Sequence, residues 1–144
     1  MIVDTSALVA FYVPERLSQF VEGELERVRD GREKCRVLDL VFYEFPNAVR
    51  KRVVRGTLGE EEGKEIVEAG LSFVELCEVV SGRELAREAY EIGLKYSLSV
   101  YDASLIALAV RLDDVILTAD EKLLRAVRGI QEVSKYFVFP EVEG

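Results

Sequence analysis

The sequence predicts an α/β fold: a three-layer α/β/α arrangement with a central parallel sheet of about five short strands. Two observations lead to this prediction. Apolar runs of strand length alternate along the chain with longer helical patterns. The runs are continuously apolar, as expected for strands that helices cover on both faces of a parallel sheet. The chain has 144 residues, the length of one ordinary domain, so we expect residues 1–144 to form a single domain.

The first half of the chain is expected to contain two strands and four helices. The strands are predicted at residues 1–4 and 36–39, and the helices at residues 6–13, 14–30, about 42–55 and 58–71. Gly31 is expected to stop the second helix, because glycine is the usual residue just beyond a helix C-terminus. Pro46 restricts the start of the third helix, because proline is tolerated only in a first turn, whose N–H groups have no acceptor. Glu44 is therefore expected at that helix start.

The second half is expected to alternate three strands with three helices. The strands are predicted at residues 73–79, 115–118 and 133–139, and the helices at residues 82–96, 101–112 and 119–127. Parallel strands joined by helices imply right-handed crossovers. Three pairs have the spacing of a capping box, which marks a helix start: Thr57 with Glu60, Ser81 with Glu84, and Thr118 with Glu121.

Four acidic residues lie where a predicted strand ends or a predicted helix begins: Asp4, Glu44, Asp102 and Asp120. In a sheet of this kind ligands bind outside the carboxyl ends of the strands, and we expect the four side chains to meet there. The chain contains no histidine. Clustered carboxylates without imidazole are suited to hard divalent cations such as Mg²⁺ or Mn²⁺. The pattern therefore predicts a metal-dependent nuclease.

Each acidic residue also has a purely structural alternative. Asp102 opens a strongly apolar helix and Asp120 lies inside a capping box. The alternative for both is that they stabilise a helix end and have no part in a functional site. Glu44 can be an exposed acid of a first turn. Asp4 is harder to explain in this way, because a carboxylate that closes an apolar strand loses hydration and needs donors or a metal.

Four segments around these acids share their order and spacing with a known family: VDTSAL at residues 3–8, EFPNA at 44–48, YDASLIALA at 101–109 and LTADEKLL at 117–124. Over nearly the whole chain they resemble the PIN-domain family, particularly its small VapC-type toxin ribonucleases. The resemblance implies that the four acids hold Mg²⁺ or Mn²⁺ and that single-stranded RNA is the substrate. It implies supporting roles for Ser6, Asn47 and Thr118, a small antitoxin protein as partner, and a homodimer or larger homo-oligomer.

Two charge features bear on RNA binding. The net charge of −8 argues against a nucleic-acid partner, because affinity for phosphates comes mainly from Lys and Arg. However, a basic cluster follows Glu44 on the same predicted helix, and we expect it to contact RNA: Arg50, Lys51, Arg52 and Arg55. Its structural alternative is a solvated helix face.

Two pairs of residues have open interpretations. Tyr43 and Tyr101 stand beside two of the acids and can stack on unpaired bases, although aromatics in an apolar context more often belong to the core. Cys35 and Cys77 are expected to be buried apolar side chains. If the source organism is heat-adapted, as the low Asn, Gln and His content suggests, a disulfide between them becomes possible.

The function predicted from the acids and the resemblance is that of an Mg²⁺- or Mn²⁺-dependent endoribonuclease, the toxin of a toxin–antitoxin pair. Two alternatives remain: an exonuclease acting on single-stranded nucleic acid, and a catalytically degenerate protein of the same fold that binds a partner. A phosphatase with Asp4 as nucleophile is disfavoured, because such enzymes place a second acid where this chain has Ser6. No stretch reaches the roughly 20 apolar residues of a membrane span, so we expect a soluble, cytoplasmic protein with no membrane partner.

Overall fold

The computed structural model of the chain describes residues 1–141. Within them a parallel sheet has the strand order β3-β2-β1-β4. Ile2 stands at its centre, paired with Arg36 on one side and Ile116 on the other. The predicted α/β class is confirmed. The strands are β1 (Ile2–Val3), β2 (Arg36–Leu38), β3 (Glu78–Val80) and β4 (Ile116–Leu117).

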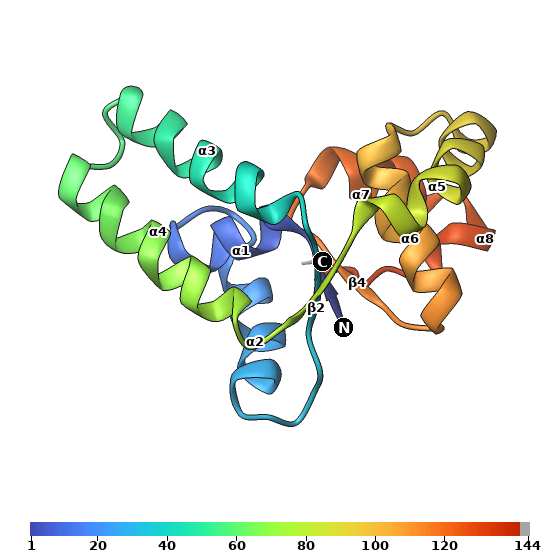
Figure 1. Cartoon of the computed structure of the whole chain (residues 1–144), viewed down its shortest axis with the longest axis horizontal. Helices are drawn as coiled ribbons and strands as arrows, with labels where there is room; N and C mark the ends of the chain where they lie inside the picture. Colours follow the sequence, from blue (N-terminus) through green and yellow to red (C-terminus); the bar gives the residue numbers. More distant parts are fainter. Residues whose placement is uncertain (142–144) are drawn as a thin grey trace.

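Helices pack on both sides of this sheet, so the predicted three layers are present (Figure 1). One side carries α1 (Thr5–Tyr12), α2 (Ser18–Arg29), α3 (Val41–Val54) and α4 (Glu60–Val74). The other side carries α5 (Gly82–Tyr96), α6 (Val100–Leu112), α7 (Glu121–Arg128) and α8 (Gln131–Ser134). Strand residues fill the space between the layers, and Ile2, Ile116 and Leu117 have no exposed surface.

The predicted strand at residues 133–139 is wrong. Its start is occupied by α8, and the segment reaches the sheet only through a parallel bridge between Phe137 and Ile116. Val133 and Phe137 are both buried. Apolar residues four positions apart fit one face of a helical turn as well as they fit a buried strand, and the sequence pattern does not separate the two.

The predicted boundary between residues 71 and 73 is also wrong. Phe73 and Val74 do not begin a strand but form the buried last turn of α4, and β3 begins at Glu78. They follow Gly70 at helical spacing and continue its buried face. A strand-like apolar run at the end of an amphipathic helix was thus misassigned to the sheet.

Helix starts agree only partly with the capping pattern. Ser81 caps α5 as expected, its hydroxyl accepting from the N–H of Arg83 at 3.2 Å. Gly59 instead caps α4, while the Thr57 hydroxyl donates to the carbonyl of Arg52 at 3.0 Å. The cap of α7 is Asp120 rather than the predicted Thr118.

Two helices differ from the prediction near a proline. Pro46 lies inside α3, beyond the first turn that contains Glu44, whereas the sequence placed it within that turn. The second helix starts at Ser18 rather than at residue 14. Its predicted stop is correct: Gly31 follows the end of α2 with φ +74°, a backbone conformation that glycine adopts readily.

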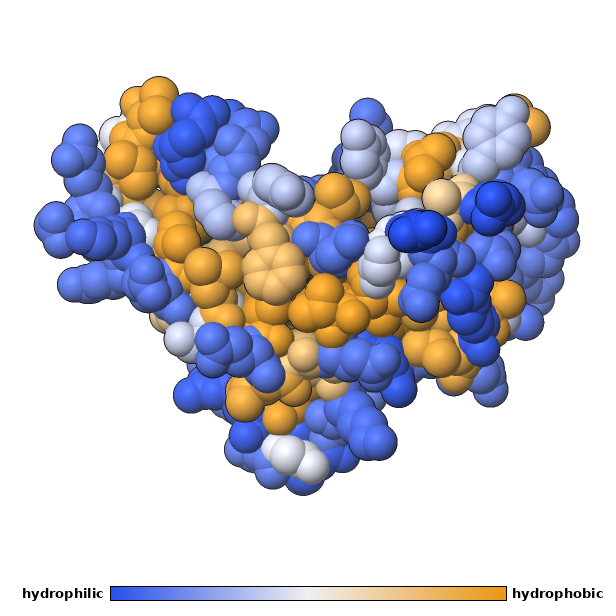
Figure 2. Space-filling model, in the orientation of Figure 1, coloured by the Kyte–Doolittle hydropathy of each residue, from blue (hydrophilic) through white to orange (hydrophobic). Residues whose placement is uncertain are grey.

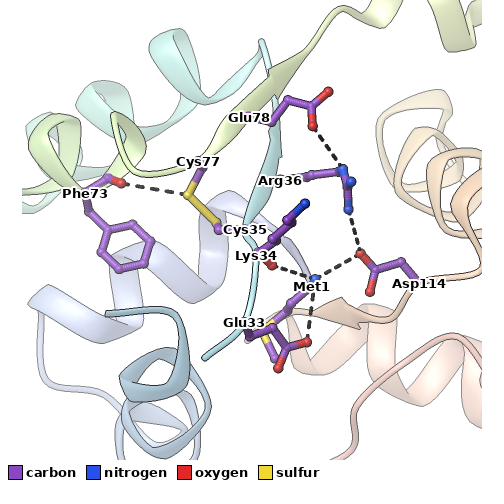
Figure 3. Close-up of a disulfide and its surroundings, with 9 residues drawn as sticks. All are labelled: Met1, Glu33, Lys34, Cys35, Arg36, Phe73, Cys77, Glu78 and Asp114. Atoms are coloured by element: carbon purple, nitrogen blue, oxygen red, sulfur yellow. Dashed lines mark hydrogen bonds and ion pairs between the residues drawn. A yellow bond between two sulfur atoms is a disulfide. The ribbon is translucent and has the colours of Figure 1, made fainter. Parts of the chain in front are cut away.

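The two cysteines form a disulfide (Figure 3). Cys35 precedes β2 and Cys77 precedes β3, with their Cα atoms 4.6 Å apart. The expectation of two separate apolar side chains is therefore wrong, and the alternative of a bridge is correct. Nearby, the Arg36 guanidinium contacts Glu78 at 3.2 Å and Asp114 at 3.3 Å. These contacts join three strands at the amino edge of the sheet, opposite to the edge where the strands end.

Close packing of α3 on α4 depends on Gly70. A Cβ atom at this position would stand 2.0 Å from the ring of Phe45, which has no exposed surface. We expect Gly70→Ala to lower the free energy of unfolding by about 1–3 kcal/mol, because overpacking forces a buried ring to move. Denaturant unfolding measures this loss.

Gly23→Ala is the matched control for that substitution. Gly23 lies inside α2 with no atom within 4 Å of a Cβ atom built there, so the change should stabilise the protein by about 0.5–1 kcal/mol. Equal effects of the two substitutions would contradict the packing described for Gly70.

None of the helices within residues 1–141 combines the length and the hydrophobicity that a membrane-spanning helix needs.

Candidate active site

Asp4 lies at the carboxyl end of β1, where the chain turns into α1. Its N–H donates to the carbonyl of Leu117 at 2.9 Å, which aligns the ends of β1 and β4. One oxygen of its half-buried carboxylate, Oδ2, accepts from the Ser6 hydroxyl and from the Thr118 hydroxyl, both at 2.8 Å. Two hydroxyl donors directed at one oxygen favour the ionised carboxylate.

The same two hydroxyls are fixed from behind by backbone N–H groups. The Ser6 oxygen accepts from the N–H of Ala119 at 3.0 Å, and the Thr118 oxygen accepts from the N–H of Asp120 at 3.1 Å. Each hydroxyl proton is thereby left for Asp4. Thr118 is fully buried, so solvent does not compete for the bonds of its hydroxyl. The network sets the position of the Asp4 carboxylate relative to the chain that leads into α7.

The other three acids each open a helix. Asp120 caps α7, its Oδ1 accepting from the N–H of Leu123 at 3.1 Å. Glu44 lies in the first turn of α3, and its Oε1 accepts from the Thr5 hydroxyl at 2.9 Å. Asp102 lies in the first turn of α6, where its N–H donates to the Ser99 hydroxyl at 3.1 Å. The helix-end roles considered for Asp102 and Asp120 are thus present in the structure.

The sequence analysis did not identify two residues that contact the acids, Thr5 and Ser99. Thr5 orients Glu44 across 39 positions of sequence, and no local pattern carries that information. Ser99 caps α6 three residues before Asp102, which is the spacing of a capping box with aspartate as the acid. This second signal was present in the sequence and would have placed the start of α6 at Val100.

Three of the four acids line one small pocket at the carboxyl ends of β1 and β2, namely Asp4, Glu44 and Asp102. Among the residues described by the structure, no lysine or arginine is part of its lining. The remaining lining is mostly apolar, with two hydroxyls, those of Thr5 and Tyr101: Val3, Thr5, Leu38, Leu40, Tyr101 and Leu105. The pocket opens between the starts of α3 and α6, where the surface in Figure 2 is hollowed.

The carboxylates influence one another's protonation. Burial raises the pKa of Asp4, against the hydrogen bonds from Thr118 and Ser6, and the charge of Asp120 raises it further. Loss of hydration raises the pKa of Glu44, and the charges of Asp4 and Asp102 add to the effect. The pKa of Asp102 is raised first by loss of hydration and then by Asp4 and Asp120. All four acids therefore share one electrostatic field.

This donor set has the chemistry that a hard divalent cation needs. Carboxylate oxygens are the preferred ligands of Mg²⁺ and Mn²⁺, and a cation would offset both the loss of hydration and the repulsion that raise the three pKa values. In the part of the chain that the structure describes, however, no three acidic or cysteine side chains stand close enough to form a ready-made metal-binding group. The carboxylates therefore fit a divalent cation by their chemistry, but their side chains do not already surround a metal position.

The pH dependence of stability follows from these shifts. A carboxyl whose folded-state pKa is raised binds more protons in the folded state, so stability falls as pH rises from its ordinary pKa, 3.8 for Asp102, through the raised value. Without added metal, we expect Asp102→Asn to melt a few degrees above the wild type at pH 7. The difference should vanish below pH 3.8. A variant that melts lower than the wild type at pH 7 would contradict this account.

The remaining predicted site residues lie further along α3 and outside the pocket lining. Asn47 does not contact the carboxylates but accepts from the Arg50 guanidinium at 3.1 Å. Arg52 donates to the carbonyl of Ala48 at 3.0 Å, while Lys51 and Arg55 are exposed. With a rise of about 1.5 Å per residue, this basic stretch begins roughly 9 Å beyond Glu44 along the helix axis. It can reach only the flanks of a substrate bound in the pocket.

Comparison with known proteins assigns the chain to a family. The family model described as PIN domain matches residues 1–129. The chain is 35% identical over 123 residues to Ribonuclease VapC3 of Pyrobaculum aerophilum, which covers 85% of this chain and 91% of that protein. Its fold is similar to the crystal structure of PAE2754 from Pyrobaculum aerophilum, with TM-score 0.64, 25% identity, and coverage of 89% of this chain and 79% of the other.

A more distant neighbour has the same fold. It is VapBC2 from Rickettsia felis bound to a DNA fragment from its promoter, with TM-score 0.60, 13% identity, and coverage of 87% of this chain and 91% of the other. The match of the family model and the identity to Ribonuclease VapC3 each extend over most of the sequence. The chain belongs to the PIN domain family.

Proposed function

We propose that this protein is a ribonuclease that depends on Mg²⁺ or Mn²⁺ and cleaves single-stranded RNA internally. The observation that carries the proposal is the shared pocket of Asp4, Glu44 and Asp102 at the carboxyl edge of the sheet, with Asp120 close enough to raise the pKa of two of them. The 35% sequence identity with Ribonuclease VapC3 supports the choice of RNA as substrate.

The roles of the side chains follow from their contacts. Asp4, Glu44 and Asp102 would hold the cation, and Asp120 would add negative charge beside it. The chemistry that bound Mg²⁺ or Mn²⁺ supplies is neutralisation of charge at the phosphodiester and acidification of water. Two hydroxyls fix the Asp4 carboxylate and partly offset the burial that raises its pKa, and the Thr5 hydroxyl does the same for Glu44.

Internal cleavage is tested with a circular single-stranded RNA. An endonuclease opens the circle, whereas an exonuclease leaves it intact and degrades only its linear form. We expect the wild type to convert the circle to linear fragments when Mg²⁺ or Mn²⁺ is present. Digestion of linear RNA alone would favour the exonuclease, and no cleavage of either form would favour a partner-binding protein without catalytic activity.

The biological role that we propose is that of a toxin neutralised by a small antitoxin protein. The resemblance to VapC-type members supports this role, and it also suggests that the chain acts as a homodimer in the cytoplasm. Co-expression with the adjacent reading frame of its genome tests the pairing. We expect a stable complex that elutes as one species and has lost its ribonuclease activity, whereas unchanged activity would contradict it.

The exposed cations of α3 should contribute to RNA binding through phosphate contacts. For single strands the logarithm of the binding constant falls with the logarithm of salt concentration by about 0.7 per phosphate contact. We expect Lys51→Gln with Arg55→Gln to reduce this slope by about 1.4. Lys64→Gln, which removes an exposed cation from α4, is the control and should leave the slope unchanged. An unchanged slope in the double variant would show that Lys51 and Arg55 make no phosphate contacts.

A further inference from the structure

The first turns of α3 and α6 carry the same pattern of side chains. Residues 42–44 and residues 100–102 each consist of an exposed apolar residue, an exposed tyrosine and an acid that lines the pocket. Tyr43 exposes 78% of its surface and Tyr101 exposes 63%. The alternative considered in the sequence analysis, that these tyrosines belong to the core, is therefore wrong for both.

Both tyrosines belong to helix turns that contribute an acid to the carboxylate pocket. Tyr101 is part of its lining, and Tyr43 immediately precedes Glu44, which also lines it. Their helices belong to the two different layers that flank the sheet (Figure 1). The turns that carry the two tyrosines therefore reach the pocket from different layers of the fold.

Exposure alone does not mark a ligand site, because Tyr90 on α5 is 62% exposed; Tyr43 and Tyr101 differ from it in standing directly before an acid of the pocket. Two other tyrosines are half-buried and use their hydroxyls within the protein: Tyr12 donates to the carbonyl of Ala69, and Tyr96 donates to the carboxylate of Glu132. Large aromatic side chains contribute to stability chiefly through the area that they bury. Tyr43 and Tyr101 bury little of it, so their rings are available to a ligand.

The charge of the pocket favours a ligand group that binds by stacking. Three carboxylates line the pocket, and the cations of α3 lie further along the helix. A bound divalent cation and Lys122, whose charge lowers the pKa of Asp102, would attract the reacting phosphate itself. No basic side chain of the described residues lines the pocket, so the bases of the neighbouring nucleotides need another source of affinity. Stacking of a nucleobase on an aromatic ring needs no charge and contributes by itself.

We propose that Tyr43 and Tyr101 stack on unpaired bases on the two sides of the scissile phosphate and so select single-stranded nucleotides. This inference rests on the ribonuclease function proposed above. Bases in a duplex are already stacked on their neighbours, while those of single-stranded segments can be splayed onto aromatic side chains. The two rings then supply both affinity and discrimination against paired RNA.

The test couples each tyrosine to a base. The preferred cleavage site in a single-stranded RNA is mapped first, and two substrates are then made in which the nucleotide on one or the other side of that site lacks its base. We expect Tyr43→Ala and Tyr101→Ala each to raise KM for the intact RNA about 5- to 140-fold, with little change in kcat. Tyr43→Phe and Tyr101→Phe keep the ring and should behave as the wild type.

The abasic substrates separate stacking from a structural role. Removing the contacted base should raise the wild-type KM by a similar factor but should have little further effect on the matching alanine variant. Tyr90→Ala is the control, because Tyr90 is 62% exposed on α5 and does not line the pocket. Alanine variants that match this control, or losses that are equal on intact and abasic RNA, would overturn the inference.

Failure of the proposed function gives a different result. In that case the wild type cleaves no RNA, and binding of the same oligonucleotide is followed by tyrosine fluorescence, since the chain has six tyrosines and no tryptophan. Quenching that is lost in Tyr43→Ala and Tyr101→Ala but kept in Tyr90→Ala would still support stacking. Quenching that all three variants retain, or no binding at all, would overturn it.

Discussion

Asp102→Asn is expected to lose at least about a hundredfold in RNA cleavage while the fold is retained. Asn keeps the size of the side chain but removes the charge needed to hold a divalent cation, whose stabilisation of a phosphoryl transition state amounts to several kcal/mol. The backbone N–H of Asp102, which bonds Ser99, is unaffected. Initial rates on a labelled single-stranded RNA measure the loss, and circular dichroism tests the fold. Asp4→Asn should lose activity to the same extent.

Asp113→Asn is the control for this loss. It makes the same chemical change at the other end of α6, on an exposed residue with φ +51° that asparagine tolerates well. Cleavage by this variant should equal that of the wild type. If Asp102→Asn and Asp4→Asn also retain full activity, these two carboxylates have no catalytic role and the site assignment is wrong.

Removal of the disulfide is expected to have the largest effect on stability. Cys35 and Cys77 are 42 positions apart, and closing a loop of this size in the unfolded chain corresponds to about 4 kcal/mol in the chain-entropy description. We expect the double variant Cys35→Ala with Cys77→Ala to melt about 10–15 °C below the oxidised wild type. Differential scanning calorimetry measures the shift.

Two comparisons make this prediction specific. The wild type kept in reductant should melt close to the double variant, because both lack the bridge. Cleavage well below the melting temperature should change little, since the disulfide joins the strands at the edge opposite the pocket. A shift of less than about 3 °C would show that the bridge does not constrain the unfolded chain as described.

Local patterns were sufficient to predict the fold class and the placement of the acids. Strand-length apolar runs placed β1, β2 and β4. Asp4 follows β1 directly, and Asp120 lies three residues beyond the end of β4. Parallel strands end at one edge of the sheet whatever their separation in sequence, so the meeting of three acids in one pocket followed from topology alone. The proline rule placed Glu44 correctly in the first turn of α3 although Pro46 itself lies beyond that turn, and the Ser99 cap of α6 was present in the sequence but not used.

What the sequence did not show depends on contacts made after folding. The disulfide requires the starts of β2 and β3 to be neighbours, and the bond from Thr5 to Glu44 requires α1 and α3 to meet. Exposure of Tyr43 depends on which face of α3 packs inward. The prediction of a strand at residues 133–139 was wrong for a different reason: apolar residues at this spacing fit a helical turn and a strand equally well.

The most direct test of the proposed ribonuclease is cleavage of an end-labelled, mixed-sequence single-stranded RNA with Mg²⁺, with Mn²⁺ or with EDTA, by the wild type beside Asp102→Asn. We predict cleavage by the wild type with either metal, no cleavage in EDTA, and almost none by the variant under any condition. Cleavage that survives both EDTA and the substitution would contradict a metal site at these carboxylates. An inactive wild type in every condition would contradict the ribonuclease function itself.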